Sequence, residues 1–254
     1  MTLPQSVILG VVQGITEFFP ISSSAHLVIA QNLFGIKEPQ LAFDIFLHIG
    51  TLISILIYFR KDIADLITRQ WRLYACIAVA TIPTAMIGFM LKDAVEEIFA
   101  RLHVVGYSLL ATGFLLLATS VYIKINKSKE GNKVGFLNSI VIGIAQGMAV
   151  IPGISRSGAT ICSGVLSGIS KESAFRFSFL LAIPAILGAS LLKFHKIEAG
   201  FASGDYLNFI CGGIAAMVTG LISISLLLKV IRQDKLYLFG IYCIVVSALV
   251  IILL

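Results

Sequence analysis

The stretch QGITEFFPISSSAH, residues 13–26, places a carboxylate, three consecutive serines and an imidazole inside strongly apolar sequence. It lies within an apolar region, 3–34, which Pro20 and the serines divide into two pieces. Each piece is shorter than the roughly 20 residues that a membrane-spanning helix needs. The break therefore favours a re-entrant helix–loop–helix hairpin, and a single kinked spanning helix is the alternative.

A second stretch, QGMAVIPGISRSGAT at residues 146–160, repeats this outline and adds an arginine. It interrupts the apolar region 134–168 in the same way, and GVVQG at 10–14 matches GIAQG at 143–147. We therefore expect one membrane domain, 1–254, built from repeats of approximately 1–126 and 133–254. Each repeat contains one hairpin and three spans, and this odd number of spans inverts the second repeat relative to the first.

The composition is that of an integral membrane protein. Of 254 residues, 58% are hydrophobic and 13% are charged, whereas a soluble domain carries about 25% charged residues. Six further apolar segments are long enough to span a bilayer: 40–59, 73–91, 103–123, 173–192, 206–228 and 236–254. The sequence thus predicts an all-α membrane protein with six transmembrane helices and two re-entrant hairpins.

The basic residues predict an orientation. If each hairpin returns to its starting side, thirteen of the nineteen lysines and arginines fall on one face, in segments 60–72, 124–133, 171–176 and 229–235, and five fall on the other. The face richer in positive charge should be cytoplasmic. We therefore expect both termini outside and a site that opens to the outer face. Anionic lipid headgroups explain the net charge of +6 better than nucleic acid does.

The first interrupted stretch supplies candidate reactive groups. Gln13 and Glu17 are four residues apart and share one helix face. Glu17 at membrane depth indicates a functional group, although a hydrogen-bonded structural role is the alternative. His26 could orient a substrate and exchange protons, or it could be structural. Three serines are candidate nucleophiles, ligands or helix caps: Ser22, Ser23 and Ser24.

Arg156 is the decisive residue of the second stretch. A guanidinium at membrane depth needs an anionic partner, and its fork matches phosphate; a structural ion pair with Glu17 is the alternative. The neighbouring residues offer tight turns, hydroxyls and the free N–H groups of a helix start. The candidate phosphate-binding residues are Gly153, Ser155, Ser157, Gly158 and Thr160. The two stretches together predict hydrolysis of a phosphate-bearing substrate.

Asp44 and His48 are also four residues apart, within the first predicted span. They could line the same cavity and bind substrate, or they could form a buried hydrogen-bonded pair. A divalent cation could bridge Glu17 and a diphosphate, although the sequence contains no dedicated metal-binding motif.

These motifs resemble those of the bacterial undecaprenyl-diphosphate phosphatase (bacitracin-resistance) family. The family's first motif is matched from Gln13 to His26, with glutamine at a first position that can be glutamate. Its second motif, Pro-Gly-x-Ser-Arg-Ser-Gly-x-Thr, is matched in full from Pro152 to Thr160. The stretch from Asp44 to Thr51 also resembles the family, and the similarity extends over the whole chain.

The resemblance implies hydrolysis of undecaprenyl diphosphate to undecaprenyl phosphate and inorganic phosphate in the bacterial cytoplasmic membrane, which recycles a carrier for peptidoglycan synthesis. It implies Ser23 or His26 as nucleophile, Glu17 as an acid/base or metal-linked carboxylate, and Arg156 as the phosphate clamp. It further implies Mg²⁺ or Ca²⁺, and as partners a polyprenyl diphosphate and bilayer lipids; a homodimer is left open. A lipid-phosphate flippase or alternating-access transporter is the other hypothesis, because such carriers also use inverted repeats with broken helices.

Overall fold

The computed structural model describes residues 1–36, 40–68, 70–92, 94–95, 102–126, 133–194 and 206–253. All the regular elements within these ranges are helices. Six of the basic residues counted above lie outside the described ranges: Lys37, Arg69, Arg101, Lys127, Lys129 and Lys196.

The first interrupted region folds as two short helices that lie side by side, α1 (Leu3–Thr16) and α2 (Ser23–Leu33). The chain reverses in the turn between them, which contains Pro20. The Ser22 side chain caps α2 by accepting a hydrogen bond from the Ala25 N–H at 3.4 Å. The region is therefore a helical hairpin and not one kinked helix.

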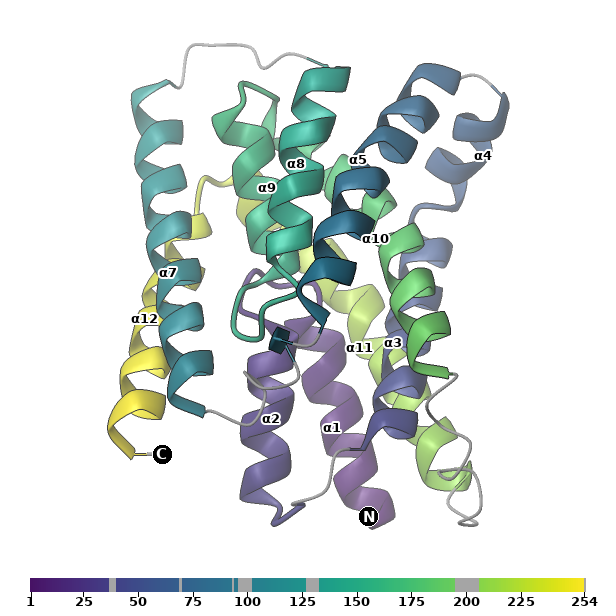
Figure 1. Ribbon diagram of the computed structural model, residues 1–254, viewed down its shortest axis with the longest axis vertical. Helices are drawn as coiled ribbons and strands as arrows, with labels where there is room; N and C mark the ends of the chain where they lie inside the picture. The colour runs from purple at the N-terminus through teal and green to yellow at the C-terminus, as the bar shows by residue number, and fades with distance from the viewer. Residues whose placement is uncertain are drawn as a thin grey trace.

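The second interrupted region forms a matching hairpin from α8 (Phe136–Met148) and α9 (Arg156–Leu166). Figure 1 shows α1 and α2 extending from the lower end of the molecule and α8 and α9 from the upper end, so that the two turns meet near the middle. Ser155 caps α9 by accepting a hydrogen bond from the Gly158 N–H at 3.1 Å. Both caps therefore lie where the two hairpins meet.

Six longer helices surround the hairpins: α3 (Leu41–Tyr58), α5 (Trp71–Met90), α7 (Leu102–Ile125), α10 (Lys171–Phe194), α11 (Tyr206–Arg232) and α12 (Leu236–Leu253). Five of them are long and apolar enough to cross a membrane, while α12 is apolar but shorter. Each of the six overlaps one of the apolar segments expected from the sequence. A further short helix that the sequence did not predict, α4 (Arg60–Thr68), follows α3 almost directly.

Glycines allow the first helix of each hairpin to pack closely against a long helix. A Cβ on Gly14 of α1 would lie 2.0 Å from Thr219 Oγ1 and 2.5 Å from the Ala216 carbonyl oxygen, both on α11. A Cβ on Gly143 of α8 would lie 2.2 Å from the Ala80 carbonyl oxygen on α5. Only glycine therefore permits either contact, and each occurs in the GxxQG motif that the two stretches share.

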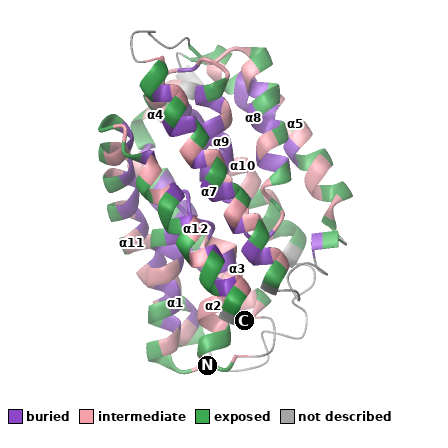
Figure 2. Cartoon of the chain, turned by 90° about the vertical axis from the view of Figure 1, so that its left-hand side faces the viewer, coloured by how far each residue is buried: buried purple, intermediate pink, exposed green. Residues whose placement is uncertain are grey.

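Large apolar side chains cover the outside of the helices. Figure 2 shows buried residues on inward helix faces and exposed residues on outward faces. Among the exposed are Met86 on α5, Phe114 on α7 and Ile222 on α11, each more than half accessible. Contact of so much apolar surface with water would be unfavourable, whereas its contact with lipid chains would not. The chain is thus an all-helical, multi-pass membrane protein.

Candidate active site

Glu17 lies at the centre of the site, at the end of α1, where it is 7% exposed. Its Oε1 accepts a hydrogen bond from Arg156 Nη2 at 2.5 Å. Its Oε2 accepts hydrogen bonds from Ser23 Oγ at 2.5 Å and from Gln13 Nε2 at 3.1 Å. The predicted proximity of these groups is confirmed, because one carboxylate joins α1, α2 and α9.

Arg156 is the first residue of α9 and reaches Glu17 across the interface between the hairpins. Its side chain is 17% exposed. Within the described residues, Glu17 is the one acceptor that its guanidinium contacts. A guanidinium has five N–H donors, so Arg156 retains donors for a phosphate while it holds Glu17.

Direct hydrogen bonds hold the two turns together. The Gly153 N–H donates to Ser24 Oγ at 3.3 Å, and Ser157 Oγ donates to the Phe19 carbonyl at 3.3 Å. Gly158 also packs against the first turn, since a Cβ there would lie 3.3 Å from Pro20 Cβ. Residues more than 120 positions apart thus form one polar cluster, as the sequence predicted.

The N-termini of α2 and α9 both lie in this cluster. Unpaired N–H groups at a helix start favour an anion, and two such starts reinforce each other. Hydroxyl pairs line the same region, Ser22 with Ser24 at 3.1 Å and Ser155 with Ser157 at 3.2 Å. Ser22 also has a φ of 67°, a left-handed conformation that is costly for a residue with a side chain. The cluster is therefore suited to a phosphate group.

His26 is held away from the carboxylate by other partners. Its Nδ1 lies 2.8 Å from the Ser22 carbonyl oxygen, which can only accept, so Nδ1 carries a proton. Its Nε2 lies 2.8 Å from the Tyr242 hydroxyl, and the two rings stack. Because a neutral imidazole then accepts at Nε2, the hydroxyl of Tyr242 occupies the lone pair that a nucleophilic histidine would use.

His48 reaches the site, but Asp44 does not contact Glu17. His48 Nε2 lies 4.0 Å from Glu17 Oε2, while its Nδ1 donates to the Asp44 carbonyl oxygen at 2.8 Å. The Asp44 carboxylate accepts a hydrogen bond from Gln31 Nε2 at 3.2 Å. The expected common location thus holds for His48, whereas the bond to Gln31 places the Asp44 side chain beside α2.

Thr160 faces the interior of the helix bundle. Its hydroxyl donates to the Arg156 carbonyl oxygen at 2.8 Å and lies 2.5 Å from Ser178 Oγ on α10. These contacts anchor the first turn of α9, so Thr160 supports Arg156 and does not present its hydroxyl to the cluster.

The site offers oxygen atoms that could bind a divalent cation together with the phosphate oxygens of a substrate. Gln13 is fully buried, and its Oε1 has no hydrogen-bond partner in the described part of the chain. This amide oxygen and the Glu17 carboxylate are hard donors of the kind that Mg²⁺ and Ca²⁺ take, and Mg²⁺ commonly adds phosphate oxygens as ligands. No group of three His, Cys, Asp or Glu residues suited to a metal occurs in the ranges described. The protein groups that would hold a cation here are therefore the Glu17 carboxylate and the Gln13 amide oxygen.

Two supporting residues were missed by sequence reasoning. Thr112 on α7 donates to the Gly153 carbonyl at 3.1 Å and accepts from the Ser155 N–H at 3.1 Å, which fixes the second turn. Tyr242 on α12 holds His26. Neither residue lies in a motif. The one signal in the sequence is a hydroxyl group within an otherwise apolar helix.

Comparison with known proteins matches residues 6–249 to the family described as bacitracin resistance protein BacA. The undecaprenyl-diphosphatase of Halothermothrix orenii is 42% identical over 100% of this chain and 98% of its own. The undecaprenyl-diphosphatase of Carboxydothermus hydrogenoformans is 42% identical over 98% and 96%, respectively. The protein of the same name from Methanosphaera stadtmanae is 41% identical over 98% and 96%. The chain therefore belongs to the bacitracin resistance protein BacA family.

Proposed function

We propose that this protein hydrolyses undecaprenyl diphosphate to undecaprenyl phosphate and inorganic phosphate. The observation that carries this proposal is the contact of Glu17 with both Ser23 and Arg156, which joins a nucleophile, a base and an anion clamp. Relatives named undecaprenyl-diphosphatase over nearly their whole length support the substrate. Nothing in these relatives' names favours the flippase or transporter hypothesis.

Ser23 is the nucleophile in the proposed mechanism. Its Oγ attacks the terminal phosphorus and gives its proton to Glu17, to which it is already hydrogen-bonded. The bond from that phosphorus to the bridging oxygen breaks, and undecaprenyl phosphate leaves with this oxygen. Water then hydrolyses the phosphoserine, which releases inorganic phosphate and restores Ser23. The geometry supports Ser23 over His26, because Tyr242 occupies His26 Nε2.

Arg156 and the two helix starts bind the charge that develops on the phosphate oxygens. The guanidinium supplies planar donors, and the first turns of α2 and α9 supply backbone N–H groups. Gly153 lets the second turn approach closely because it has no side chain. His48, 4.0 Å from Glu17, helps to neutralise the carboxylate when protonated.

The proposed site has room in its chemistry for Mg²⁺ or Ca²⁺. Such a cation would supply positive charge that stabilises the phosphate groups of the substrate. Glu17 and the Gln13 amide oxygen are the protein groups that would hold it.

An apolar recess beside the second turn suits part of the prenyl chain. It measures about 260 Å³ and lies between α7, α8 and α9, with Leu115, Met148, Ile154 and Leu166 in its lining. Ile154 directly precedes the α9 cap, so the recess begins next to the proposed phosphate site. A lipid diphosphate would place its diphosphate in the polar cluster and the first part of its prenyl chain in this recess.

The proposed topology is that of six spans and two re-entrant hairpins in inverted repeats. Pairwise packing supports it: α1 packs on α11, the second long helix of the other repeat, and α8 packs on α5, its counterpart. Likewise α7 packs on α12, the last helix of each repeat. Each contact thus has a counterpart when the two repeats are interchanged. A pseudo-two-fold axis in the membrane plane that relates the repeats would produce this pattern. In this proposal both termini and the site opening lie on the outer side, which the charge asymmetry of the sequence supports.

Phosphate release from undecaprenyl diphosphate by the purified protein tests the function. We expect release by the wild type and a loss of at least about 10³-fold in Arg156→Ala and in Ser23→Ala, since both remove groups that act on the transferred phosphate. Arg176→Ala is the matched control, because Arg176 forms an exposed ion pair with Asp62 away from the site. Phosphate release by the folded Arg156→Ala variant at the wild-type rate would overturn the clamp assignment, and no release by the wild type would overturn the function.

A further inference from the structure

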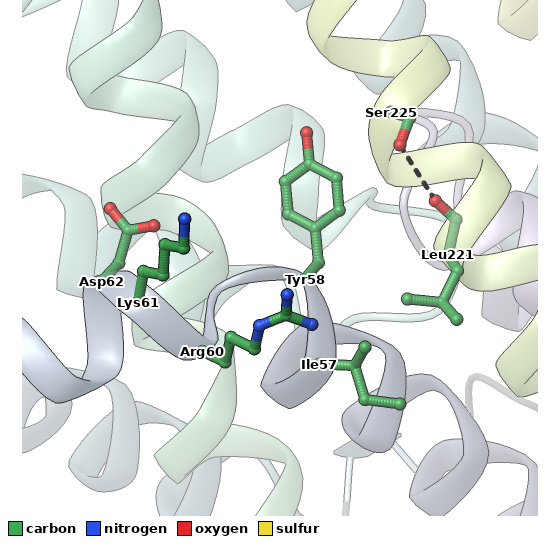
Figure 3. Close-up of a pocket in the computed structure, with 7 residues that line it drawn as sticks. All are labelled: Ile57, Tyr58, Arg60, Lys61, Asp62, Leu221 and Ser225. Carbon is green, nitrogen blue, oxygen red and sulfur yellow. Dashed lines mark hydrogen bonds between the residues drawn. The ribbon is translucent and has the colours of Figure 1, made fainter.

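A second polar recess lies apart from the Glu17–Arg156 cluster, where α3 passes into α4 (Figure 3). Its volume is about 390 Å³. One wall is formed by Ile57 and Tyr58 at the end of α3, and by Arg60, Lys61 and Asp62 at the start of α4. Leu221 and Ser225 on α11 form the facing wall. The recess therefore lies between the α3–α4 junction and α11, which are adjacent in space and distant in sequence.

Its charge is positive. Arg60 and Lys61 are exposed, and no carboxylate in the described part of the chain lies within ion-pair distance of either. Asp62 is the one acid in the lining, and Arg176 on α10 pairs with it at 3.2 Å. The negative charge of Asp62 is thus already balanced, which leaves two cations without a counter-ion.

The recess also lies at a boundary between apolar and polar surface. From Ile49 to Tyr58, α3 carries no charged side chain, and three charged residues in succession then begin α4. Apolar side chains on the outside of both walls are exposed, with Ile57 40% and Leu226 44% accessible. Tyrosine and basic residues at the end of an apolar helix are typical of the membrane–water interface.

We propose that this recess binds the headgroup of an anionic phospholipid. Arg60 and Lys61 donate to the phosphate, and the acyl chains lie along Ile57 and the exposed apolar side chains of α11. The predicted orientation places the recess in the cytoplasmic leaflet. The site is separate from the phosphatase centre, because none of the residues that contact Glu17 in the described part of the chain lines the recess.

Native mass spectrometry of the full chain, extracted in detergent and titrated with phosphatidylglycerol or phosphatidylcholine, tests this proposal. We expect the wild type to retain one phosphatidylglycerol in preference to phosphatidylcholine. Replacing both cations, Arg60→Gln with Lys61→Gln, should weaken that retention at least about tenfold, because each basic residue near an anionic headgroup contributes several-fold. Ser225→Phe should also weaken it, since the ring fills the recess and leaves both cations in place.

Arg72→Gln with Lys133→Gln is the matched control. Both residues are exposed and basic and belong to the same predicted face, but neither lines the recess. Equal loss of lipid in this pair would show general attraction to the face and overturn the proposal, as would unchanged retention in the Arg60/Lys61 pair. Displacement of the lipid by millimolar inorganic phosphate that binds on its own would identify free phosphate as the ligand. Phosphate release in detergent by each variant confirms that it is folded.

Discussion

Gly153 holds the second turn in a backbone conformation that a side chain would not tolerate. Its φ is 96°, and a Cβ there would lie 2.4 Å from the Val105 carbonyl oxygen and 2.6 Å from Ser108 Cβ. Gly153→Ala should therefore push the turn away from α7 and break its hydrogen bonds to Ser24 and Thr112. We expect a fall in phosphate release of more than about tenfold and a lower melting temperature, since strain of this kind costs roughly 1–3 kcal/mol.

Gly168→Ala separates the two causes of this effect. Gly168 also has a positive φ of 85°, but a Cβ at this position would meet no atom within 4 Å. That variant should lose stability through backbone strain and keep its rate of phosphate release. If both variants released phosphate at the same reduced rate, the close approach at Gly153 would not be what positions the site.

We expect Gln13 to set how strongly phosphate release depends on the proposed divalent cation. Its Nε2 donates to Glu17 Oε2, and a glutamate would replace this donor with a second carboxylate. Two adjacent carboxylates repel each other unless a cation or proton lies between them. When Mg²⁺ is chelated, phosphate release by Gln13→Glu should therefore fall roughly tenfold below that of the wild type, which corresponds to about 1.4 kcal/mol. When Mg²⁺ is added back, this variant should reach half of its full activity at a lower Mg²⁺ concentration than the wild type.

Gln13→Met serves as the comparison, because it removes the same donor without adding charge. Its Mg²⁺ titration should have the wild-type midpoint or a higher one. A Gln13→Glu midpoint equal to that of Gln13→Met would argue against a cation beside Glu17.

At the scale of helices, the contact of α1 with α11 depends on Gly14. A Cβ at this position would meet a backbone carbonyl of α11 at 2.5 Å, which cannot move independently of its helix. Gly14→Ala should displace α1, and with it Glu17 one turn later. We expect destabilisation of about 1–3 kcal/mol, as for other overpacked interfaces, together with reduced phosphate release.

Gly188→Ala in α10 is the control for this substitution, because nothing lies within 4 Å of a Cβ there. It should leave melting temperature and activity close to those of the wild type. Wild-type stability in Gly14→Ala would mean that α1 and α11 are less closely packed than the structure shows.

Most helices could be predicted from the sequence because membrane-crossing segments are recognisable by length and apolar composition alone. The boundaries of α3 and α5 fall within two residues of the segments predicted at 40–59 and 73–91. The hairpins were recognisable because proline and serines break an apolar region twice. Helix α4 was not, since its nine residues mix apolar and charged side chains and begin directly after α3.

At the scale of the whole molecule, the site could be predicted only as far as the motifs reach. Charge indicated that Arg156 needs an anionic partner, and the ion pair with Glu17 that the structure shows was the alternative to phosphate binding. The partners of His26 did not follow, since Tyr242 lies 216 residues away and contacts it only through the packing of α12. The motif also includes a residue that does not face the site: the hydroxyl of Thr160 bonds to Ser178 on α10 and so stabilises the packing of α9.

The proposed inverted arrangement makes a prediction about which side of the membrane each hairpin enters from. Gly35 lies just beyond α2 and Lys133 just before α8, so the proposed topology places the first outside and the second in the cytoplasm. In a background without the four native cysteines, a membrane-impermeant maleimide should label Gly35→Cys in intact cells. Lys133→Cys should react only after the membrane is permeabilised. Labelling of both positions in intact cells would contradict the topology, because the hairpins would then enter from the same side and the repeats would be parallel.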